Sequence, residues 1–359
     1  MFRVKRYYSK ITNVYNDINL LSKKPQTSTN LNGLIEFGNI NKKKNIVYAS
    51  QYMYNELPIR FAHKIKDLDS LPYDLYNNLY INTIRNWYIT SFDDMLNLKY
   101  PTDFNDSLEM VCTIENIYNR HSPTLITMAN GIQSIKNEKI DINENDIQTF
   151  LNKFYMSRIG IRVLLSHYSM IFKKTNTYEY GIINTKCSPY NIIKDVTTDI
   201  NSMCENSNIE PVEININHNT ITFPYISSHL YYILFEVLKN SVKATHDFNK
   251  TKLPPINIEL LNDNNWIIIK VSDLGGGISP TSYDKIWNYF YTTAENPINI
   301  IDNDFSINTP LSGFGYGLPI TKLYLKYFGG HINICSNHNY GTDTYILLRV
   351  NGDFNEPLL

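Results

Sequence analysis

The sequence has few of the features that mark an extracellular, membrane-spanning or nucleic-acid-binding protein. Its four cysteines, Cys112, Cys187, Cys204 and Cys335, lie far apart and form no C-x-x-C pair. We therefore predict free thiols in a reducing compartment, without a disulfide framework or a cysteine-based metal site. No apolar run approaches the ~18 residues that a membrane-spanning helix needs. The 33 basic residues balance 34 acidic ones, which leaves no large net charge to attract nucleic acid or an anionic membrane.

Length and apolar content indicate a globular protein of two domains. A chain of 359 residues is longer than most single domains, and 43% hydrophobic residues are sufficient for ordinary cores. Since the net charge is close to zero, any partner has to be recognised through a local surface.

The first thirty residues differ from the rest of the chain in charge. The basic residues at positions 3, 5, 6 and 10 all precede the first acid, Asp17. A basic, acid-poor start with hydroxyl residues is typical of a mitochondrial transit peptide, and a disordered basic tail is the alternative. We assign residues 1–30 to this segment, outside the folded core.

Residues 31–175 are predicted to form a helical domain. Apolar residues recur with a period near 3.6 around 59–66, 79–98, 104–117 and 146–172, and these segments are separated by two X-Pro pairs and a polar stretch at 136–145. Four such helices suggest an antiparallel four-helix bundle. Residues 176–189 show little periodicity and are predicted to form an inter-domain linker.

Residues 229–245 form the most informative stretch of the sequence. On a helix, Tyr232, Glu236, Asn240 and Lys243 fall within a narrow arc, whereas Leu230, Leu234, Val237, Leu238 and Ser241 fall on the apolar face. An acid, an amide oxygen and an amine can supply a proton acceptor, a ligand for a hard metal ion and a phosphate contact, which phosphoryl transfer requires. The alternative is a solvated polar stripe on an amphipathic helix.

Three later segments favour a nucleotide site. Asp273 follows the strand-like run 266–271, and Gly275 to Gly277 behind it allow a ligand to approach the backbone. The glycine-rich run S-G-F-G-Y-G at 312–317 leads into a predicted helix, whose N-terminus can bind phosphate. Gly341 and Thr342 open the last predicted strand. The four segments together, in this order, are a strong signal.

Residues 190–352 are predicted to form an α/β sandwich with a mixed sheet and helices on one face. Helix 190–204 precedes strand-like runs at 210–216, 219–223, 256–261, 266–271, 331–335 and 344–350, with a hairpin signal at 262–265. The polar segment between 289 and 313 has no clear period, and we interpret about 290–317 as a lid over the nucleotide.

These four segments resemble the ATP-binding fold shared by gyrase, the Hsp90 chaperones, histidine kinases and MutL. A closer resemblance is to the mitochondrial kinases that phosphorylate 2-oxoacid dehydrogenases. It is carried by L-P-I-R-F-A-H-K-I-K-D-L-D-S-L-P (57–72), R-N-W-Y-I-T-S (85–91), F-Y-M-S-R-I-G-I-R-V-L (154–164) and G-F-G-Y-G-L-P-I (313–320). The resemblance covers about residues 33–350. It implies an α+β protein of two domains, a four-helix bundle followed by an ATP-binding sandwich.

The resemblance also assigns roles on the central helix. It implies that Glu236 takes the proton from the acceptor hydroxyl, with Tyr232 one turn before it where pyruvate dehydrogenase kinases have a His. Asn240 is expected to bind Mg²⁺ through its amide oxygen. Lys239 and Lys243 are expected to contact phosphates, Lys243 standing in place of a usual Arg.

The remaining nucleotide contacts are expected on loops and strand ends. Asp273 accepts a hydrogen bond from the adenine amino group, and Thr342 supports the same edge of the ring. The other expected contacts are at Gly275, Gly277, Thr292, Gly313, Phe314, Gly315, Tyr316, Gly317 and Leu318.

Arg158 and Arg162 lie four apart in an otherwise apolar run and share one side of a helix. Because arginine is rarely buried without a partner, they either pair with acids such as Asp67 or Asp94 or line an anion pocket.

The family resemblance implies a regulatory site for pyruvate-like carboxylates at these arginines. The matching positions are Arg158, Tyr88, Ser91 and His121, whereas Tyr118 stands where pyruvate dehydrogenase kinases carry a second Arg. Such a site would bind a small carboxylate.

The sequence therefore predicts an ATP- and Mg²⁺-dependent protein serine kinase of the mitochondrial matrix. Its expected substrate is the α subunit of a 2-oxoacid dehydrogenase complex, pyruvate or branched-chain, which phosphorylation inactivates. The resemblance implies the lipoyl-bearing acyltransferase core as a partner and a homodimer, and we expect no nucleic acid and no membrane span. The alternatives are a histidine kinase that labels His63, a MutL- or Hsp90-like ATPase that modifies no protein, and a pseudokinase scaffold that binds the acyltransferase core without turnover.

Overall fold

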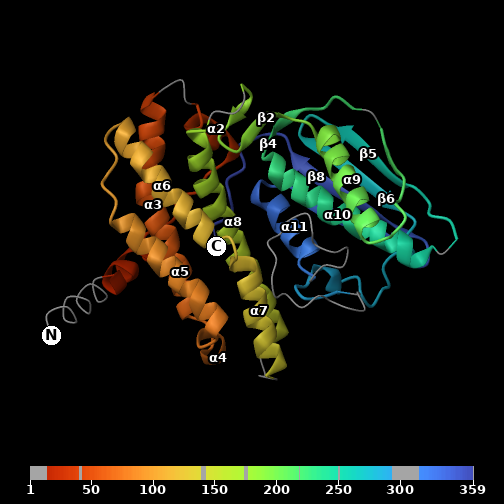
Figure 1. Ribbon diagram of the computed structural model, residues 1–359, viewed down its shortest axis with the longest axis horizontal. Helices are drawn as coiled ribbons and strands as arrows, with labels where there is room; N and C mark the ends of the chain where they lie inside the picture. The colour runs from red at the N-terminus through yellow and green to blue at the C-terminus, as the bar shows by residue number, and fades with distance from the viewer. Residues whose placement is uncertain are drawn as a thin grey trace.

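The computed structural model describes residues 14–39, 43–138, 143–173, 177–217, 219–249, 251–292 and 315–358. In these residues a helical domain lies beside a domain built on a sheet (Figure 1). The predicted α+β organisation is confirmed. Residues 293–314, which hold most of the predicted lid together with Gly313 and Phe314, lie outside the described residues.

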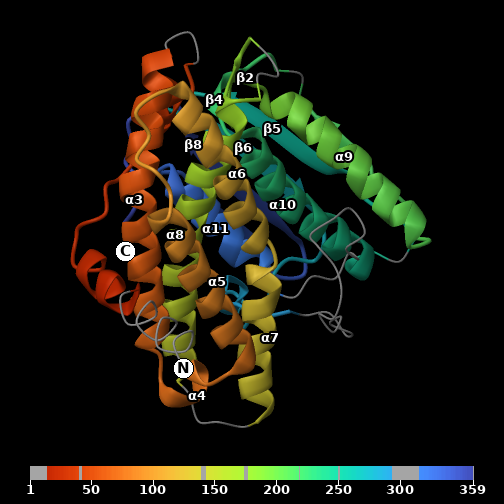
Figure 2. The same ribbon diagram turned by 60° about the vertical axis from the view of Figure 1, so that its left-hand side comes forward.

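The helical domain contains more helices than the sequence pattern predicts. Its helices are α2 (Leu31–Phe37), α3 (Lys43–Asp69), α4 (Tyr73–Tyr76), α5 (Leu79–Leu96), α6 (Phe104–Arg120), α7 (Thr124–Asn137) and α8 (Glu144–Ile171). Helix α3 packs against α5, α6 and α8, whereas α7 packs against α4 and α5 (Figure 2). The pattern misses α7, because only His121, Ser122 and Pro123 separate it from α6. A simple four-helix bundle is therefore not confirmed.

Short polar side chains set the starts of these helices. Asn78, Asp103 and Asn143 occupy extended positions just before α5, α6 and α8, and the side chain of each accepts a hydrogen bond from a first-turn backbone amide. Such caps satisfy amides that have no partner within the helix.

The segment 14–30 belongs to the folded part of the protein, contrary to the predicted boundary at residue 30. Ile18 is 1% exposed and joins the core of the helical domain. The carbonyl of Thr27 accepts a hydrogen bond of 2.7 Å from Arg60 Nη2. The boundary predicted at residue 30 lies too far along the chain, because the basic, acid-poor composition ends at Asp17.

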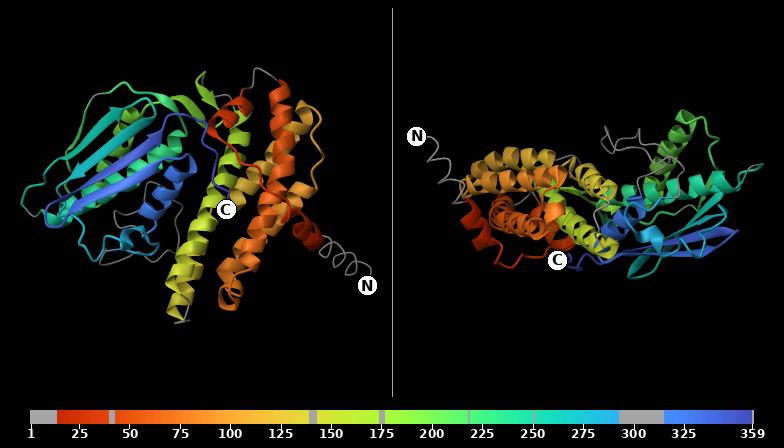
Figure 3. Two further views of the ribbon diagram at one scale, coloured as in Figure 1. Left: turned by 180° about the vertical axis from the view of Figure 1, so that it is seen from behind. Right: turned by 90° about the horizontal axis from the view of Figure 1, so that it is seen from below.

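The second domain has a five-stranded mixed sheet covered by three helices. The helices are α9 (Pro189–Asn206), α10 (Ser227–Phe248) and α11 (Gly317–Tyr327). The strand order is β3 (Ile214–Ile216), β5 (Ile256–Asn262), β6 (Trp266–Asp273), β8 (Gly341–Arg349) and β7 (His331–Asn337). Only β3 and β5 are parallel among these neighbours. The helices lie on one face of the sheet, as predicted (Figure 3).

Three predictions near the domain boundary differ from the structure. The predicted linker 176–189 contains β1 (Glu179–Tyr180) and β2 (Ile183–Cys187), and β2 pairs with β4 (Phe223–Tyr225) in a separate three-stranded sheet. The expected strand at 219–223 is therefore displaced to β4, and the expected strand at 210–216 shrinks to β3. These strands are too short to show a period in the sequence, and only pairing defines them.

A buried ion pair ties the end of the chain to both domains. Arg60 Nη2 lies 2.5 Å from Glu356 Oε1, and Arg60 Nε lies 2.8 Å from Glu56. Tyr327 of α11 and Thr29 donate hydrogen bonds of 2.8 and 2.9 Å to the Glu356 carboxylate. Burial alone would raise the pKa of Glu356, but Arg60 and these hydrogen bonds hold the pKa below its ordinary value.

Glu356→Ala is expected to lower the free energy of unfolding by about 3–5 kcal/mol, because it leaves Arg60 buried without this partner. Chemical denaturation at neutral pH measures the loss. Since the folded pKa is lowered, the carboxylate stabilises the fold above the unfolded pKa of roughly 4.3. The difference between wild type and the variant should therefore shrink as the pH falls through the folded pKa. The exposed Glu259→Gln variant should unfold like wild type, and an equal loss there would contradict the assignment.

Candidate active site

Helix α10 presents an apolar face to the core and the candidate catalytic residues on its other side. Leu230, Leu234 and Leu238 are fully buried, as the predicted amphipathic pattern requires. Glu236 is only 7% exposed, whereas Asn240 is exposed and Lys243 partly so. The polar face is therefore not a simple solvated stripe, because its central acid is buried.

The Glu236 carboxylate is held by an ion pair within the helix. Lys239 Nζ donates to Glu236 Oε1 at 2.7 Å, and both side chains are more than 90% buried. Lys239, expected at a phosphate, thus binds Glu236 in this structure. The pair fixes the orientation of the carboxylate, because a buried charge is stable only with its partner in place.

Gly317 brings the start of α11 against Glu236. A Cβ atom on Gly317 would overlap Glu236 Oε2, so no other residue type fits without moving that carboxylate. The first turn of α11 has no side-chain cap. Its free amides and helix dipole favour negative charge at this point. Two segments that were identified separately in the sequence therefore meet at one place.

Tyr232 lies one turn before Glu236 and is half-buried. Its ring centroid is 5.2 Å from that of Tyr324 in α11. Burial, with the negative charge of Glu236, raises the pKa of Tyr232 well above its ordinary value. The phenol is therefore neutral at physiological pH and can donate a hydrogen bond but no positive charge.

Asp273 ends β6 opposite Thr342 of β8 and is 7% exposed. Ser241 of α10 donates to Asp273 Oδ2 at 2.8 Å, and the Gly275 amide donates to Oδ1 at 3.0 Å. Burial raises the pKa of Asp273, while these hydrogen bonds oppose the shift. The helical pattern assigns Ser241 to the apolar face and does not predict this contact. The signal available in the sequence was a hydroxyl residue among the apolar residues of that face.

The glycine loop after Asp273 packs closely on neighbouring elements. A Cβ on Gly275 would lie 2.6 Å from that of Ala244 in α10. Gly277 has φ +66° and leaves no room for a side chain against Asn337. Thr342 Oγ1 lies 3.0 Å from Ser336 Oγ. The loop, α10 and the start of β8 therefore meet around Asp273.

The described residues at the two ends of the predicted lid contact the helical domain. Gly315, with φ +74°, packs against the backbone of Tyr291. Tyr316 is buried, and its ring lies 5.9 Å from Tyr155 of α8 and 5.2 Å from Tyr289. Thr292 and Leu318 adjoin these contacts in sequence. Tyr289 and Tyr316 therefore connect the described ends of the predicted lid to α8.

The expected regulatory residues of the helical domain lie together. Ser91 Oγ is 2.9 Å from His121 Nε2, and the rings of Tyr88 and His121 are 4.3 Å apart. Arg158 Nη2 donates to the His121 carbonyl at 3.3 Å. Burial and the charge of Arg158 lower the pKa of His121 to about 3, so its ring is neutral.

The two arginines do not pair with the acids named from the sequence. Asp67 binds Lys64 and Lys153, and Asp94 binds Arg120, which explains why neither acid is free to pair. Arg162 instead donates to Tyr118 Oη at 2.6 Å and lies over its ring at 4.1 Å. Arg162 therefore faces a different environment from Arg158.

The described residues also bear on the predictions for metal clusters, membrane-spanning helices and the state of the cysteines. Within them, no cluster of three or more His, Cys, Asp or Glu side chains could hold a metal ion. No described helix combines the length and the apolar character needed to cross a membrane. The cysteines are free, as predicted. A magnesium ion would therefore need oxygen ligands from the nucleotide besides Asn240, which is the usual arrangement for this ion.

Two protein families match successive parts of the chain. Residues 28–193 match the family described as mitochondrial branched-chain alpha-ketoacid dehydrogenase kinase. Residues 226–352 match the family described as histidine kinase-, DNA gyrase B- and HSP90-like ATPase.

Similar proteins cover most of the chain. The mitochondrial pyruvate dehydrogenase (acetyl-transferring) kinase of Arabidopsis thaliana is 36% identical over 341 residues, which are 93% of each chain. Isozyme 4 of this kinase from Mus musculus is 34% identical over 93% of this chain and 83% of its own length. The Homo sapiens isozyme 4 is 34% identical over 88% of this chain and 79% of its own length. The chain therefore belongs to the family of mitochondrial 2-oxoacid dehydrogenase kinases.

Proposed function

We propose that this chain is a mitochondrial protein kinase that transfers phosphate from ATP to a serine on the α subunit of a 2-oxoacid dehydrogenase and so inactivates it. The observation that carries the proposal is that α10 contacts the start of α11 through Glu236 and contacts Asp273 through Ser241, in a member of this kinase family. The names of the relatives make pyruvate dehydrogenase the first candidate substrate. The family model at residues 28–193 makes the branched-chain enzyme the second.

Glu236 is the proposed proton acceptor for the serine hydroxyl. Its burial and its ion pair with Lys239 hold the carboxylate in one orientation, which favours proton abstraction during in-line attack. Tyr232 is the proposed hydrogen-bond donor beside it. Because its phenol is neutral, Tyr232 orients the site without adding charge.

The proposed nucleotide site lies between α10, the glycine loop and the start of α11. Asp273 and Thr342 hold the adenine edge, and Ser241 and the Gly275 amide fix the orientation of Asp273. ATP supplies the transferred phosphoryl group, and Asn240 would hold Mg²⁺ through its amide oxygen, an ion that would neutralise charge on the phosphates. Further phosphate and nucleotide contacts are proposed at Lys243, Gly277, Thr292, Gly313, Phe314, Gly315, Tyr316, Gly317 and Leu318.

Partners, location and regulation extend the same proposal. We place the protein in the mitochondrial matrix as a homodimer bound to the lipoyl-bearing acyltransferase core, with the basic start of the chain as the import signal. A small carboxylate is the proposed ligand of Tyr88, Ser91, His121 and Arg158. The close packing of these residues supports this site.

The decisive experiment incubates the protein with Mg²⁺ and radiolabelled ATP and each purified dehydrogenase complex. Acid-stable label on an α-subunit serine, with loss of dehydrogenase activity, is the expected result. Acid-labile label on this protein would support a histidine kinase, and hydrolysis without protein label would support an ATPase. His63 is a weak acceptor candidate, since its Nε2 already lies 2.8 Å from the Lys24 carbonyl.

A further inference from the structure

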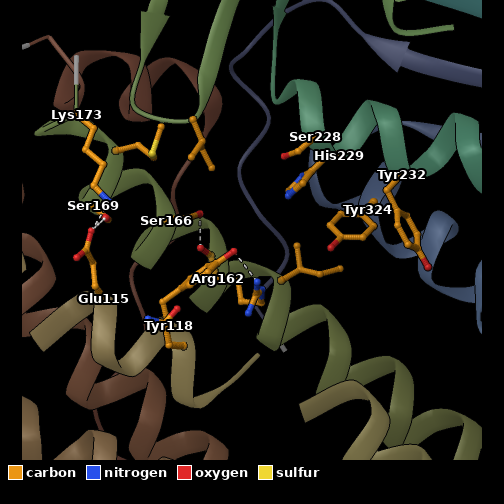
Figure 4. A pocket seen from close by; sticks show the side chains of 14 residues that line it. Glu115, Tyr118, Arg162, Ser166, Ser169, Lys173, Ser228, His229, Tyr232 and Tyr324 are labelled. Carbon is orange, nitrogen blue, oxygen red and sulfur yellow. Dashed lines mark hydrogen bonds and ion pairs between the residues drawn. The ribbon is translucent and has the colours of Figure 1, made fainter. Parts of the chain in front are cut away.

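A cavity of about 780 Å³ lies between the two domains. Helices α6 and α8 form its wall on the helical domain, and α10 and α11 form the opposite wall (Figure 4). Its volume falls within the range of ~300–1,000 Å³ that ligand sites occupy. The lining residues do not include Tyr88, Ser91 or His121. The cavity therefore does not include these three residues of the proposed regulatory cluster, whereas Tyr118 and Arg162, at positions expected in the carboxylate site, line it.

The cavity carries one unbalanced positive charge. At its outer end Lys173 lies 2.5 Å from Glu115, so these two charges cancel. Arg162 lies nearer the middle, and none of the ion pairs among the described residues includes it (Figure 4). Its Nη1 atom is buried and has no hydrogen-bond partner. An arginine without a charged partner can pair with a carboxylate, to which a guanidinium donates paired hydrogen bonds.

The walls can also bind a peptide backbone. Asn119 and Ser166 on the helical side and Ser228 on the α10 side line the cavity with amide and hydroxyl groups. His229 stacks on Tyr324 with ring centroids 4.4 Å apart, and its Nδ1 is buried without a partner. Burial lowers the pKa of His229 to about 3, so this wall is neutral at physiological pH. Arg162 is therefore the residue that makes the cavity favour a negatively charged ligand.

One end of the cavity, at Tyr232, lies one turn of α10 from the proposed catalytic acid, Glu236. Tyr232 lines this end and precedes Glu236 by four residues of α10. Residues four apart on a helix have Cβ atoms about 5–6 Å from each other. In an extended chain, a residue two or three positions from a serine lies roughly 7–10 Å away. A segment in the cavity can thus bring a serine towards Glu236 while a neighbouring side chain reaches Arg162.

We propose that this cavity receives the substrate segment around the acceptor serine and that Arg162 pairs with an acidic side chain near that serine. This inference rests on the proposed kinase function. A small carboxylate would satisfy Arg162 alone, whereas an extended segment uses both polar walls and the path to Glu236. The cavity therefore selects serines with an acidic neighbour.

The test uses the intact chain and a dehydrogenase complex whose phosphoserine has been located by mass spectrometry. Arg162→Gln is expected to raise KM for the complex roughly tenfold or more while the Kd for ATP stays unchanged. Arg162→Lys should recover part of the loss, because it restores the charge without the planar fork. Arg349→Gln, at a partly exposed arginine of β8 paired with Asp353, is the matched control and should behave as wild type.

A substrate change identifies the partner of Arg162. Acids within three positions of the phosphoserine are changed to amides, which should cost wild type about tenfold in kcat/KM and cost Arg162→Gln nothing further. Equal losses in both enzymes would overturn the inference, as would an unchanged KM in Arg162→Gln. Acetate that binds wild type but not Arg162→Gln, without competing with the complex, would also overturn it in favour of a small-anion site. Failure of wild type to label any α subunit would instead remove the proposed function, and this inference with it.

Discussion

Glu236→Gln is expected to lower phosphoryl transfer by roughly 10²-fold or more while ATP binding stays close to that of wild type. The amide has the size of the carboxylate, and its oxygen can still accept from Lys239 Nζ. It cannot take the proton of a serine hydroxyl. Single-turnover transfer to the dehydrogenase α subunit and equilibrium binding of ATP together measure the two effects.

The variant also disturbs a buried ion pair, and the control has to separate this from catalysis. Lys239 is 5% exposed, so loss of the opposing charge is expected to lower the melting temperature. Measurements are therefore made well below that temperature. Glu259→Gln on the exposed side of β5 should change neither transfer nor stability. Transfer at the wild-type rate in Glu236→Gln would show that another group accepts the proton.

The sequence was sufficient to predict the central helix and its partners because their signals are local. The spacing of Tyr232, Glu236 and Asn240 gives one face of α10, and Asp273 stands where a strand ends before three glycines. A helical period and a strand followed by glycines are both visible within about ten residues. The mixed sheet with helices on one face follows from the same patterns.

What the sequence could not give depends on contacts between distant segments. The hydrogen bond from Ser241 to Asp273 joins α10 to β6. The close approach of Gly317 to Glu236 joins α11 to α10. In the small sheet β1 and β2 pair locally, but β2 joins β4 only through the distant pairs Asn184–Tyr225 and Cys187–Phe223. None of these contacts produces a periodic pattern in the sequence. They depend on burial and strand register, which only the folded chain establishes.

The arginines of α8 illustrate the same limit. Four-residue spacing places Arg158 and Arg162 on one side of the helix, but it does not show which acids remain free. Asp67 is taken by two lysines, and Asp94 is taken by Arg120. Arg162 is consequently left to face the inter-domain cavity. The positive charge of Arg162 indicates a ligand site only because the ion pairs of Asp67 and Asp94 are formed with other residues.

Asp273→Ala is expected to weaken ATP binding by roughly ten- to a hundredfold, because a charge-assisted hydrogen bond contributes about 1.5–3 kcal/mol. The variant removes the proposed acceptor for the adenine amino group. It also leaves Ser241 Oγ and the Gly275 amide without their buried acceptor. Equilibrium binding of ATP at several temperatures below the melting transition measures the loss.

Specificity for the purine provides the sharper form of this test. If Asp273 accepts from the adenine amino group, wild type should prefer ATP to a purine triphosphate without that group, and Asp273→Ala should bind both equally. Asp284→Asn, at an exposed aspartate near the short helix η1 (Lys285–Trp287), is the control and should keep the preference. A preference that survives in Asp273→Ala would place the adenine elsewhere. Loss of binding here, combined with retained binding in Glu236→Gln, separates the group that holds ATP from the group that uses it.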